Sequence, residues 1–186
     1  WDFISSDDPT HGFVDYVTKE VALKEELIRD EPGGIFIGVN NRSVVPQTAR
    51  GRQSVRLESK RRYNEGLFII TLSHAPVSCG SWPALWMFGE DEDHQWPQWG
   101  EFDIIEWVHE EDQASAALHS RPGCSQKHLT DEEMSAKWSH GKIPSVHAKD
   151  CYVLAEDQWM NQGCSQQAAP GSIGYGFNQQ GGGTFA

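Results

Sequence analysis

The sequence WPQWGEFDIIEW, residues 96–107, sets three acids among isoleucines and aromatic side chains. Its β-branched and aromatic residues predict a β-strand. In a regular strand, successive side chains point to opposite faces, so Glu101 and Asp103 would share one face and Glu106 would point to the other. A β-bulge near residues 104–105 would insert one residue and bring all three acids to a single face. The spacing E-x-D-x-x-E therefore predicts a bulged strand.

Three neighbouring carboxylates repel one another, and at least one of them is expected to have a raised pKa. A carboxyl group with a raised pKa can donate a proton at neutral pH, while an ionised neighbour can act as a nucleophile. On the other face of the strand, Phe102 and Ile104 are expected to pack inward between two sheets. The pattern thus indicates acid and nucleophile chemistry on an anchored strand.

The rest of the chain reads as short strands separated by turns. Alternation in SVRLESK (54–60) predicts a half-buried strand, and the apolar runs GGIFIGV (33–39) and GLFIITLSH (66–74) predict two more. The one plausible helix is KEVALKEELI (19–28). Residues 162–183 are rich in Gly, Gln and Ser and read as a long loop. Strands that recur without intervening helices favour an antiparallel all-β sandwich over a βαβ scheme.

Length and charge limit the functions open to the protein. A chain of 186 residues fits one domain with a substantial core. Its 15 Lys and Arg residues stand against 27 Asp and Glu residues, which gives a net charge of −12. This charge repels a nucleic-acid backbone and offers no polybasic membrane anchor, so a neutral partner is expected. No apolar run has the length of a membrane span and no signal segment precedes Trp1, so the chain reads as a mature or trimmed product.

The four cysteines, Cys79, Cys124, Cys151 and Cys164, are spaced too widely for a zinc knuckle. Their even number predicts full pairing as disulfides, in one of three connectivities. A glycosylation sequon at residues 41–43 adds weaker support for the secretory pathway. Together these features favour an extracellular, oxidising setting. The alternative is a cytosolic protein with four reduced, buried cysteines.

Tryptophan is concentrated around the acids, where five of the eight lie. These five are Trp82, Trp86, Trp96, Trp99 and Trp107. Aromatic faces beside carboxylates form a surface on which pyranose rings can stack while acids contact hydroxyls and the glycosidic oxygen. The polar neighbours of Trp96 and Trp99 make those two hard to bury. Trp107 fits the core as well as it fits the sugar-binding surface.

At this point the sequence resembles glycoside hydrolase family 16, whose laminarinase-like branch carries a bulged G-E-x-D-x-x-E strand. The central segments of the resemblance are SWPALWMFG (81–89), WGEFDIIEW (99–107) and ALHSRPGC (117–124). The flanking segments are DDPTHGFVDY (7–16), SVRLESKRRYNEGLFI (54–69) and GSIGYGFNQQGGGTFA (171–186). They resemble fungal-type endo-1,3(4)-β-glucanases, in the same order and over nearly the whole chain.

The resemblance implies a role for each acid. Glu101 is expected to be the nucleophile and Glu106 the general acid/base, while Asp103 between them holds the geometry and charge of the nucleophile. A retaining hydrolysis through a glycosyl-enzyme ester follows from these roles. His119 matches a cleft histidine of the family that hydrogen-bonds near the reacting sugar or the nucleophile. The further residues expected to bind substrate are Arg56, Trp86, Trp96, Trp99 and Asn40.

The same resemblance implies a concanavalin-like β-jelly roll of two antiparallel sheets, with residues 1–186 forming a single catalytic domain. Family members continue past GGGTFA (181–186) into further strands, so this chain is expected to lack the final strands of the fold. The expected partner is a 1,3- or mixed 1,3-1,4-linked β-glucan polysaccharide, and neither a nucleic acid nor a membrane. A monomer is expected unless another chain supplies the C-terminal segment. No cofactor is needed, although some members hold a structural calcium ion.

Other interpretations compete with an enzyme. A non-catalytic β-glucan-binding protein, or an inactive fragment, could use the same scaffold, but both glutamates are retained. A metal protein is suggested by EDEDH (90–94) and eight histidines, yet a catalytic zinc helix would carry H-E-x-x-H, which HEED at His109 does not match. Anion or nucleic-acid binding by RGRQSVRLESKRR (50–62) conflicts with the acidic net charge, and alternation places these charges on a solvated face.

Overall fold

The computed structural model describes residues 1–186 as two compact units, Trp1–Leu67 and Phe68–Ala186. The first unit contains one short helix and three two-stranded sheets, β1 with β6, β2 with β5, and β3 with β4. Of these pairs only β2 and β5 run parallel. The elements are β1 (Asp2–Phe3), β2 (Val14–Tyr16), α1 (Lys19–Lys24), β3 (Ile28–Glu31), β4 (Gly34–Ile37), β5 (Arg52–Ser54) and β6 (Leu57–Glu58).

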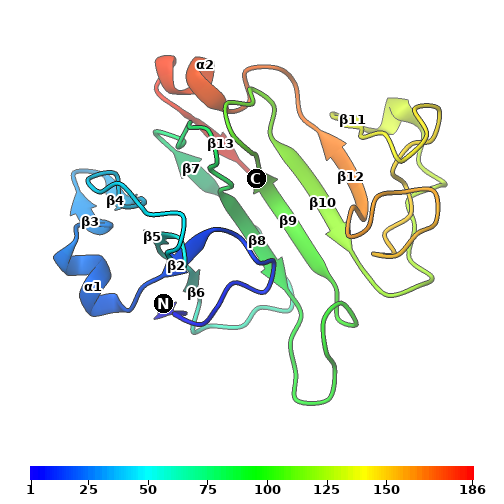
Figure 1. The fold of residues 1–186 in the computed structure, drawn as a ribbon. Coiled ribbons are helices and arrows are strands. Elements are labelled where there is room, and N and C mark those ends of the chain that lie inside the picture. The colour runs from blue at the N-terminus through cyan, green and yellow to red at the C-terminus, as the bar shows by residue number, and fades with distance from the viewer. The chain divides into compact units, whose positions relative to one another are not determined.

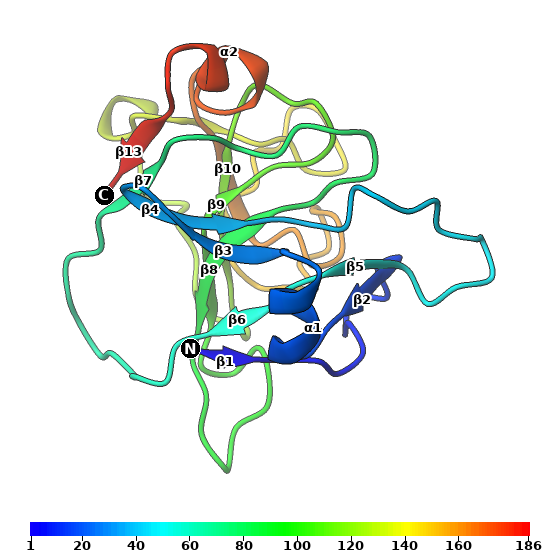
Figure 2. The same ribbon diagram turned by 90° about the vertical axis from the view of Figure 1, so that its left-hand side faces the viewer.

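Helix α1 confirms the predicted helix but is shorter than expected. The Thr18 hydroxyl accepts a hydrogen bond from the Val21 N–H and caps its first turn. The helix ends at Lys24 because Glu26 takes a positive φ of 55° and the chain then enters β3. Figure 2 shows α1 beside β3 and β4. The buried side chains of this unit are Val17, Ala22 and Leu27.

The single strand predicted over residues 54–60 is wrong in detail. The structure has β5 and β6 there, and they pair with different strands, β2 and β1. Alternation correctly indicated extended chain at this place. It could not show that the extended chain is divided between two sheets, because that depends on tertiary pairing.

The second unit is built on a five-stranded antiparallel sheet with the order β11-β12-β10-β9-β8 (Figure 1). A two-stranded sheet of β7 and β13, helix α2 and a short 3₁₀ turn (Asp131–Glu133) complete the unit. Its strands are β7 (Ile70–Leu72), β8 (Ala84–Phe88), β9 (Glu101–Glu106), β10 (Ser115–His119), β11 (Lys137–Trp138), β12 (Cys164–Gln167) and β13 (Gly183–Phe185). Neither α1 nor α2 (Gly174–Gln179) is long and apolar enough to cross a membrane.

The predicted β-bulge is confirmed in β9. On the neighbouring strand β10, Ala117 pairs with Asp103 and Ser115 pairs with Glu106. One residue of β10 therefore faces the two isoleucines of β9, residues 104–105, that separate these acids. The register with β8 shifts at the same place. The extra residue resets the alternation of side chains, which is what the acid spacing required.

The strand is anchored by a different isoleucine from the one expected. Ile105 is fully buried, whereas Ile104 packs only partly and Phe102 is 41% exposed. The core of this unit lies at the Glu106 end of β9, so Phe102 at the other end stays uncovered. Its buried residues are Ala75, Ile105, Trp107, Ala114, Ile173 and Phe177. The core interpretation of Trp107 is thus confirmed.

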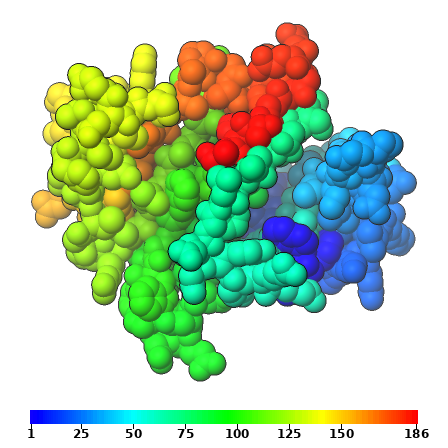
Figure 3. Space-filling view, turned by 180° about the vertical axis from the view of Figure 1, so that it is seen from behind, coloured from blue at the N-terminus to red at the C-terminus, as the bar shows by residue number.

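The interpretation of residues 162–183 as one long loop is wrong, because this segment contains β12 and α2. Phe177 of α2 is buried in the core. The side-chain amide of Asn178 accepts from the Ala75 N–H at 2.7 Å and donates to the Ala75 carbonyl at 2.9 Å. The chain then returns as β13, which lies beside β7 in Figure 3. Local propensity is weak in this Gly-rich segment, so these tertiary contacts determine its structure.

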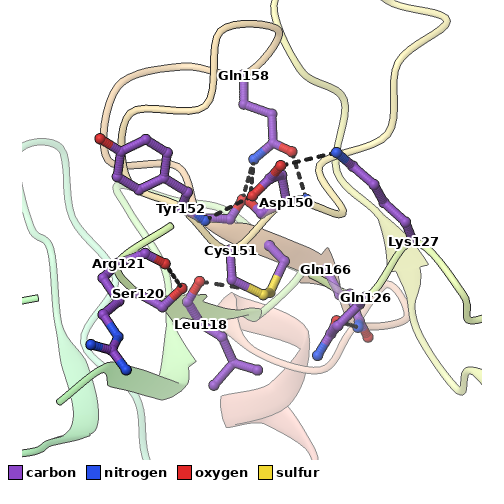
Figure 4. The surroundings of a disulfide bond; sticks show 12 residues. Leu118, Ser120, Arg121, Gln126, Lys127, Asp150, Cys151, Tyr152, Gln158 and Gln166 are labelled. Carbon is purple, nitrogen blue, oxygen red and sulfur yellow. Dashed lines mark hydrogen bonds and ion pairs between the residues drawn. A yellow bond between two sulfur atoms is a disulfide. The ribbon is translucent and has the colours of Figure 1, made fainter. Parts of the chain in front are cut away.

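One disulfide joins Cys151 to Cys164 at the start of β12 (Figure 4). The buried side chain of Gln158 fastens the loop that this disulfide closes. Its oxygen accepts from the Asp150 N–H, and its amide nitrogen donates to the carbonyls of Asp150 and Gly163. A buried amide with three hydrogen bonds holds both ends of the loop together.

The predicted pairing of all four cysteines is wrong for Cys79 and Cys124, which are exposed free thiols. The backbone around Cys79 is hydrogen-bonded to His109, beyond the Glu106 end of β9. Cys124 pairs with the backbone of Cys151, beyond the other end of β9. A six-residue strand spans about 17–20 Å. This is too far for a disulfide, whose Cα atoms lie within about 7 Å of each other.

Alkylation of the unfolded, non-reduced protein is expected to add two labels, one at Cys79 and one at Cys124. After reduction, the label count should rise to four. Peptide mapping by mass spectrometry locates the labels. An unlabelled protein before reduction would restore the original prediction that all four cysteines are paired.

Candidate active site

The bulge brings Glu101, Asp103 and Glu106 to one face of β9, as the spacing predicted. Their pairing partners on β8 are Phe88, Trp86 and Ala84. These three are alternate residues of a regular strand, so they share a face, and the acids opposite them share it too. Asp103 is buried, while both glutamates are partly buried.

His119 stands opposite Glu101 on β10 and hydrogen-bonds through Nε2 to Oδ2 of Asp103, at 2.8 Å. Its other nitrogen, Nδ1, is buried and takes part in no hydrogen bond. In the neutral imidazole, Nε2 therefore carries the proton and donates it to the carboxylate. The sequence placed His119 near the nucleophile or the sugar, and the structure places it on the acid between the two glutamates.

Gly163 allows the chain to pass closely behind His119. It has a φ of +60°, and a Cβ there would lie 2.2 Å from the Leu118 carbonyl oxygen and 3.0 Å from Nδ1 of His119. No side chain fits in that space. The loop closed by the Cys151–Cys164 disulfide can therefore end in contact with His119, which hydrogen-bonds to Asp103.

The environment raises the pKa values of both glutamates and of His119. Burial and the charge of Asp103 raise the pKa of Glu101 to about 6, against a hydrogen bond from Trp96 and the charge of His119. Burial and the charge of Asp103 also raise the pKa of Glu106, against a hydrogen bond from Trp82. Burial opposes protonation of His119, but its hydrogen bond to Asp103 and the surrounding acids raise its pKa. Both glutamates can thus hold a proton at a higher pH than an ordinary carboxyl group.

Two tryptophan side chains reach the glutamates. The indole N–H of Trp96 donates to Oε2 of Glu101, and that of Trp82 donates to Oε1 of Glu106, at 2.5 Å. Trp82 was not among the predicted site residues. The sequence marked Trp82 only as one of the five tryptophans near the acids, and its contact with Glu106 follows from the pairing of β8 with β9.

Trp99 does not reach the three acids. Its indole N–H donates to Asp91, which also accepts from His94 and the backbone of Asp93. Although partial burial opposes it, these hydrogen bonds lower the pKa of Asp91 to about 2. The acidic segment 90–94 is therefore a loop organised around one carboxylate, as the interpretation of a solvated loop predicted.

The remaining predicted residues divide between the units. Trp86 pairs with Asp103 and lies on the same face of the sheet as the three acids. Arg56 and Asn40 belong to the first unit, where Arg56 pairs with Glu58 and Asn40 hydrogen-bonds to Gln53. Their role in substrate binding stays a prediction.

Donor atoms of Glu101, Asp103 and His119 lie within 4.8 Å of one another, which is close enough for a metal ion. However, the His119 nitrogen that faces the acids is already hydrogen-bonded to Asp103. Two tryptophan N–H groups also point at the glutamates, and such donors favour anions without a metal. Hydrogen bonds from His119 and Trp96 thus already engage Asp103 and Glu101 of this cluster.

Comparison with known proteins gives consistent results. Residues 1–186 match the family described as "XgeA-like, catalytic GH16 domain". An endo-1,3(4)-β-glucanase of Arthroderma benhamiae is 39% identical over 187 residues, which cover 99% of this chain and 37% of that protein. An elongating GH family 16 β-1,3-glucosyltransferase of known structure is 36% identical, with a TM-score of 0.83 over 98% of this chain and 56% of its own.

Laminarinase 16A from Phanerochaete chrysosporium was solved with β-glucans in both donor and acceptor sites. It is 30% identical, with a TM-score of 0.83 and the same coverage of 98% and 56%. These structural matches confirm the predicted β-jelly-roll class. The chain spans about a third of the glucanase and little more than half of the solved structures.

Proposed function

The chain belongs to glycoside hydrolase family 16, and on this premise we propose that the protein cleaves β-glucan internally, with retention of configuration at the cleaved bond. The observation that carries the proposal is the single face of β9 on which a bulge gathers three acids. Retaining and inverting glycosidases both use two carboxyl groups that flank the glycosidic bond, and in a retaining enzyme one of them is the nucleophile. The retaining mechanism is therefore proposed from the resemblance to the family. The proposed substrates are 1,3- and mixed 1,3-1,4-linked glucans.

In the first step, Glu101 attacks the anomeric carbon while Glu106 gives its proton to the leaving sugar oxygen. In the second step, Glu106 removes a proton from water, which then breaks the ester on Glu101. Glu106 must therefore be protonated at the start, whereas Glu101 must be ionised. The raised pKa of Glu106 meets the first condition. The second condition is met at a pH above the Glu101 pKa of about 6.

Asp103 supplies the charge that supports the protonated state of Glu106, and the same charge moves the ionisation of Glu101 to a higher pH. Its negative charge raises the pKa of both neighbouring glutamates. The hydrogen bond from His119 holds Asp103 in place and compensates for its burial. Asp103 thus keeps a proton available on Glu106 without itself contacting the reacting bond.

Transfer to a sugar is the second candidate reaction. A structural relative at 36% identity is named as an elongating β-1,3-glucosyltransferase. A glycosyl-enzyme can be broken by a sugar hydroxyl as well as by water, with the same two glutamates in the same roles. The choice between hydrolysis and elongation depends on which acceptor the cleft holds.

The complete protein is expected to shorten laminarin, lichenan or both, and to leave agarose intact. Product chain lengths and viscosity distinguish the candidates, because internal cleavage lowers viscosity early, whereas transfer also yields chains longer than the starting material. Binding of glucan without any change in chain length would instead support a non-catalytic binding protein.

We also propose that the protein works outside the cell. The Cys151–Cys164 disulfide and the exposed sequon residue Asn41 support this location. A polysaccharide substrate fits it as well. Detection of the native protein only in the cytosol would contradict the proposal.

A further inference from the structure

We propose that Trp82 and Trp96 are positioning residues that determine where protons reside on the two glutamates. Each indole N–H occupies one carboxyl oxygen, Oε1 of Glu106 for Trp82 and Oε2 of Glu101 for Trp96. The inference rests on the proposed function for the roles of the glutamates. The hydrogen bonds themselves do not depend on those roles.

Both tryptophans hold positions that packing alone does not explain. Trp82 is 59% exposed and Trp96 is 48% exposed, so neither ring is buried in the core. Trp82 lies two residues before β8, and the carbonyl of the adjoining Pro83 accepts a hydrogen bond from the backbone N–H of Trp107, which places this segment alongside the Glu106 end of β9. Trp96 lies in the loop that leads into β9. The polar edge of each ring is thus the part with a specific partner.

An indole N–H can donate a hydrogen bond but cannot accept one. Oε1 of Glu106 must therefore act as an acceptor in both protonation states of this residue. When Glu106 is protonated, its proton is favoured on Oε2, because the hydroxyl oxygen of a carboxylic acid is a weaker acceptor than its carbonyl oxygen. Trp82 in this way assigns the transferable proton to one oxygen and leaves that oxygen free to face the leaving group.

The hydrogen bonds from the two indoles also limit how far the surroundings raise the pKa of each glutamate. Glu106 faces the charges of Asp103 on its own strand, His119 on β10 and Glu111 in the following loop. Glu101 faces Asp103 and His119. The third neighbour, β8, presents Ala84, Trp86 and Phe88, which carry no charge.

Against this background, a hydrogen bond to the ionised form lowers a carboxyl pKa. Removal of Trp82 should raise the pKa of Glu106, so this residue should stay protonated to a higher pH. Removal of Trp96 should raise the pKa of Glu101, so the nucleophile should need a higher pH to ionise. The two substitutions therefore act on opposite limbs of the pH profile.

Trp99 provides a matched control within the same loop. Its N–H also donates to a carboxylate, but that carboxylate is Asp91, which is outside the group of three acids. Because the pKa of Asp91 is about 2, the Trp99 contact does not change between pH 4 and pH 9. Trp99→Phe removes the same N–H group as the other two substitutions.

The direct test is a pH titration of the tryptophan indole N–H signals in ¹⁵N NMR spectra of the complete protein. One signal should follow Glu101 and another Glu106, with midpoints above the usual glutamate pKa. Glu101→Gln should abolish the movement of the first, and Glu106→Gln that of the second. Glutamine is close to glutamate in size, and the NMR measurement needs no assay of activity. If every indole signal keeps its pH dependence in Glu106→Gln, the proposal for Trp82 is overturned. If every indole signal keeps it in Glu101→Gln, the proposal for Trp96 is overturned.

The second test is the pH dependence of kcat/KM on glucan. Trp82→Phe should shift the alkaline limb up by roughly 0.5–1 pH unit, the effect of one hydrogen bond. Trp96→Phe should shift the acidic limb up by a similar amount. Trp99→Phe should shift neither. Unmoved limbs in the first two variants would show that these tryptophans only fill space.

These two tests separate the inference from the proposed function. If the indole signals titrate as described but the wild-type protein neither cleaves nor extends glucan, the hydrogen bonds stand and the proposed function fails. If the protein is active but the indole signals do not titrate, the function stands and the inference fails.

Discussion

Glu106→Ala is expected to reduce hydrolysis of natural β-glucan by about 10²–10⁴-fold, the usual contribution of a general acid. A sugar is a poor leaving group without a proton, and Glu106 is the residue that supplies this proton. In an aryl glycoside with an acidic phenol, the phenolate leaves without such help. Its first step should therefore be largely spared, and the glycosyl-enzyme should accumulate.

Added azide should restore turnover of this variant, because azide attacks the ester on Glu101 without a general base. The product should be a β-glycosyl azide with retained configuration, which NMR identifies. Glu110→Ala is the matched control, since this exposed glutamate lies four residues away in the following loop. It should behave as the wild type with both substrates. An α-azide from Glu106→Ala, or no effect of azide, would mean that the two carboxylates are assigned wrongly.

Glu101→Gln is expected to abolish both hydrolysis and transfer while the protein keeps its fold and binds glucan. The substitution removes the nucleophilic charge but little volume, and the amide oxygen can still accept the hydrogen bond from Trp96. Laminarin binding by affinity electrophoresis and chain-length analysis of products measure the two properties. Turnover near the wild-type rate would move the catalytic role to another residue.

Removing more of this side chain should reverse the stereochemistry. In Glu101→Ala, azide can occupy the space of the carboxylate and attack the anomeric carbon directly. The product would then be the inverted α-glycosyl azide. Opposite azide products from Glu101→Ala and Glu106→Ala would distinguish a nucleophile from a general acid/base more clearly than rates alone.

The bulged strand could be predicted from the sequence because it depends only on residues that are neighbours in the chain. Alternation along β9 fixes the faces of its side chains, and the acid spacing requires one extra residue between Asp103 and Glu106. Helix α2 and strand β12 could not be predicted in this way. Their sequences have weak local preferences, and partners distant in the chain, such as Ala75 for Asn178, hold them in place.

The same distinction applies to the site. The acids lie on one strand, so their relation follows from strand geometry. The contact between Trp82 and Glu106 joins residues on different segments and depends on the direction of one N–H group. The free state of Cys79 depends likewise on its distance from the other thiols, and this distance is a property of the folded sheet.

The most direct test of the account is to trap the glycosyl-enzyme with a 2-deoxy-2-fluoro-β-laminaribiosyl fluoride and to map the modified peptide by mass spectrometry. Fluorine at C2 slows both steps, while the fluoride leaving group keeps the first step fast enough for the ester to accumulate. We expect one added glycosyl group per molecule, attached to Glu101, and none in Glu101→Gln. A glycosyl group on Glu106 would contradict the assignment of Glu101 as the nucleophile, and release of α-configured product without any covalent adduct would contradict the retaining mechanism.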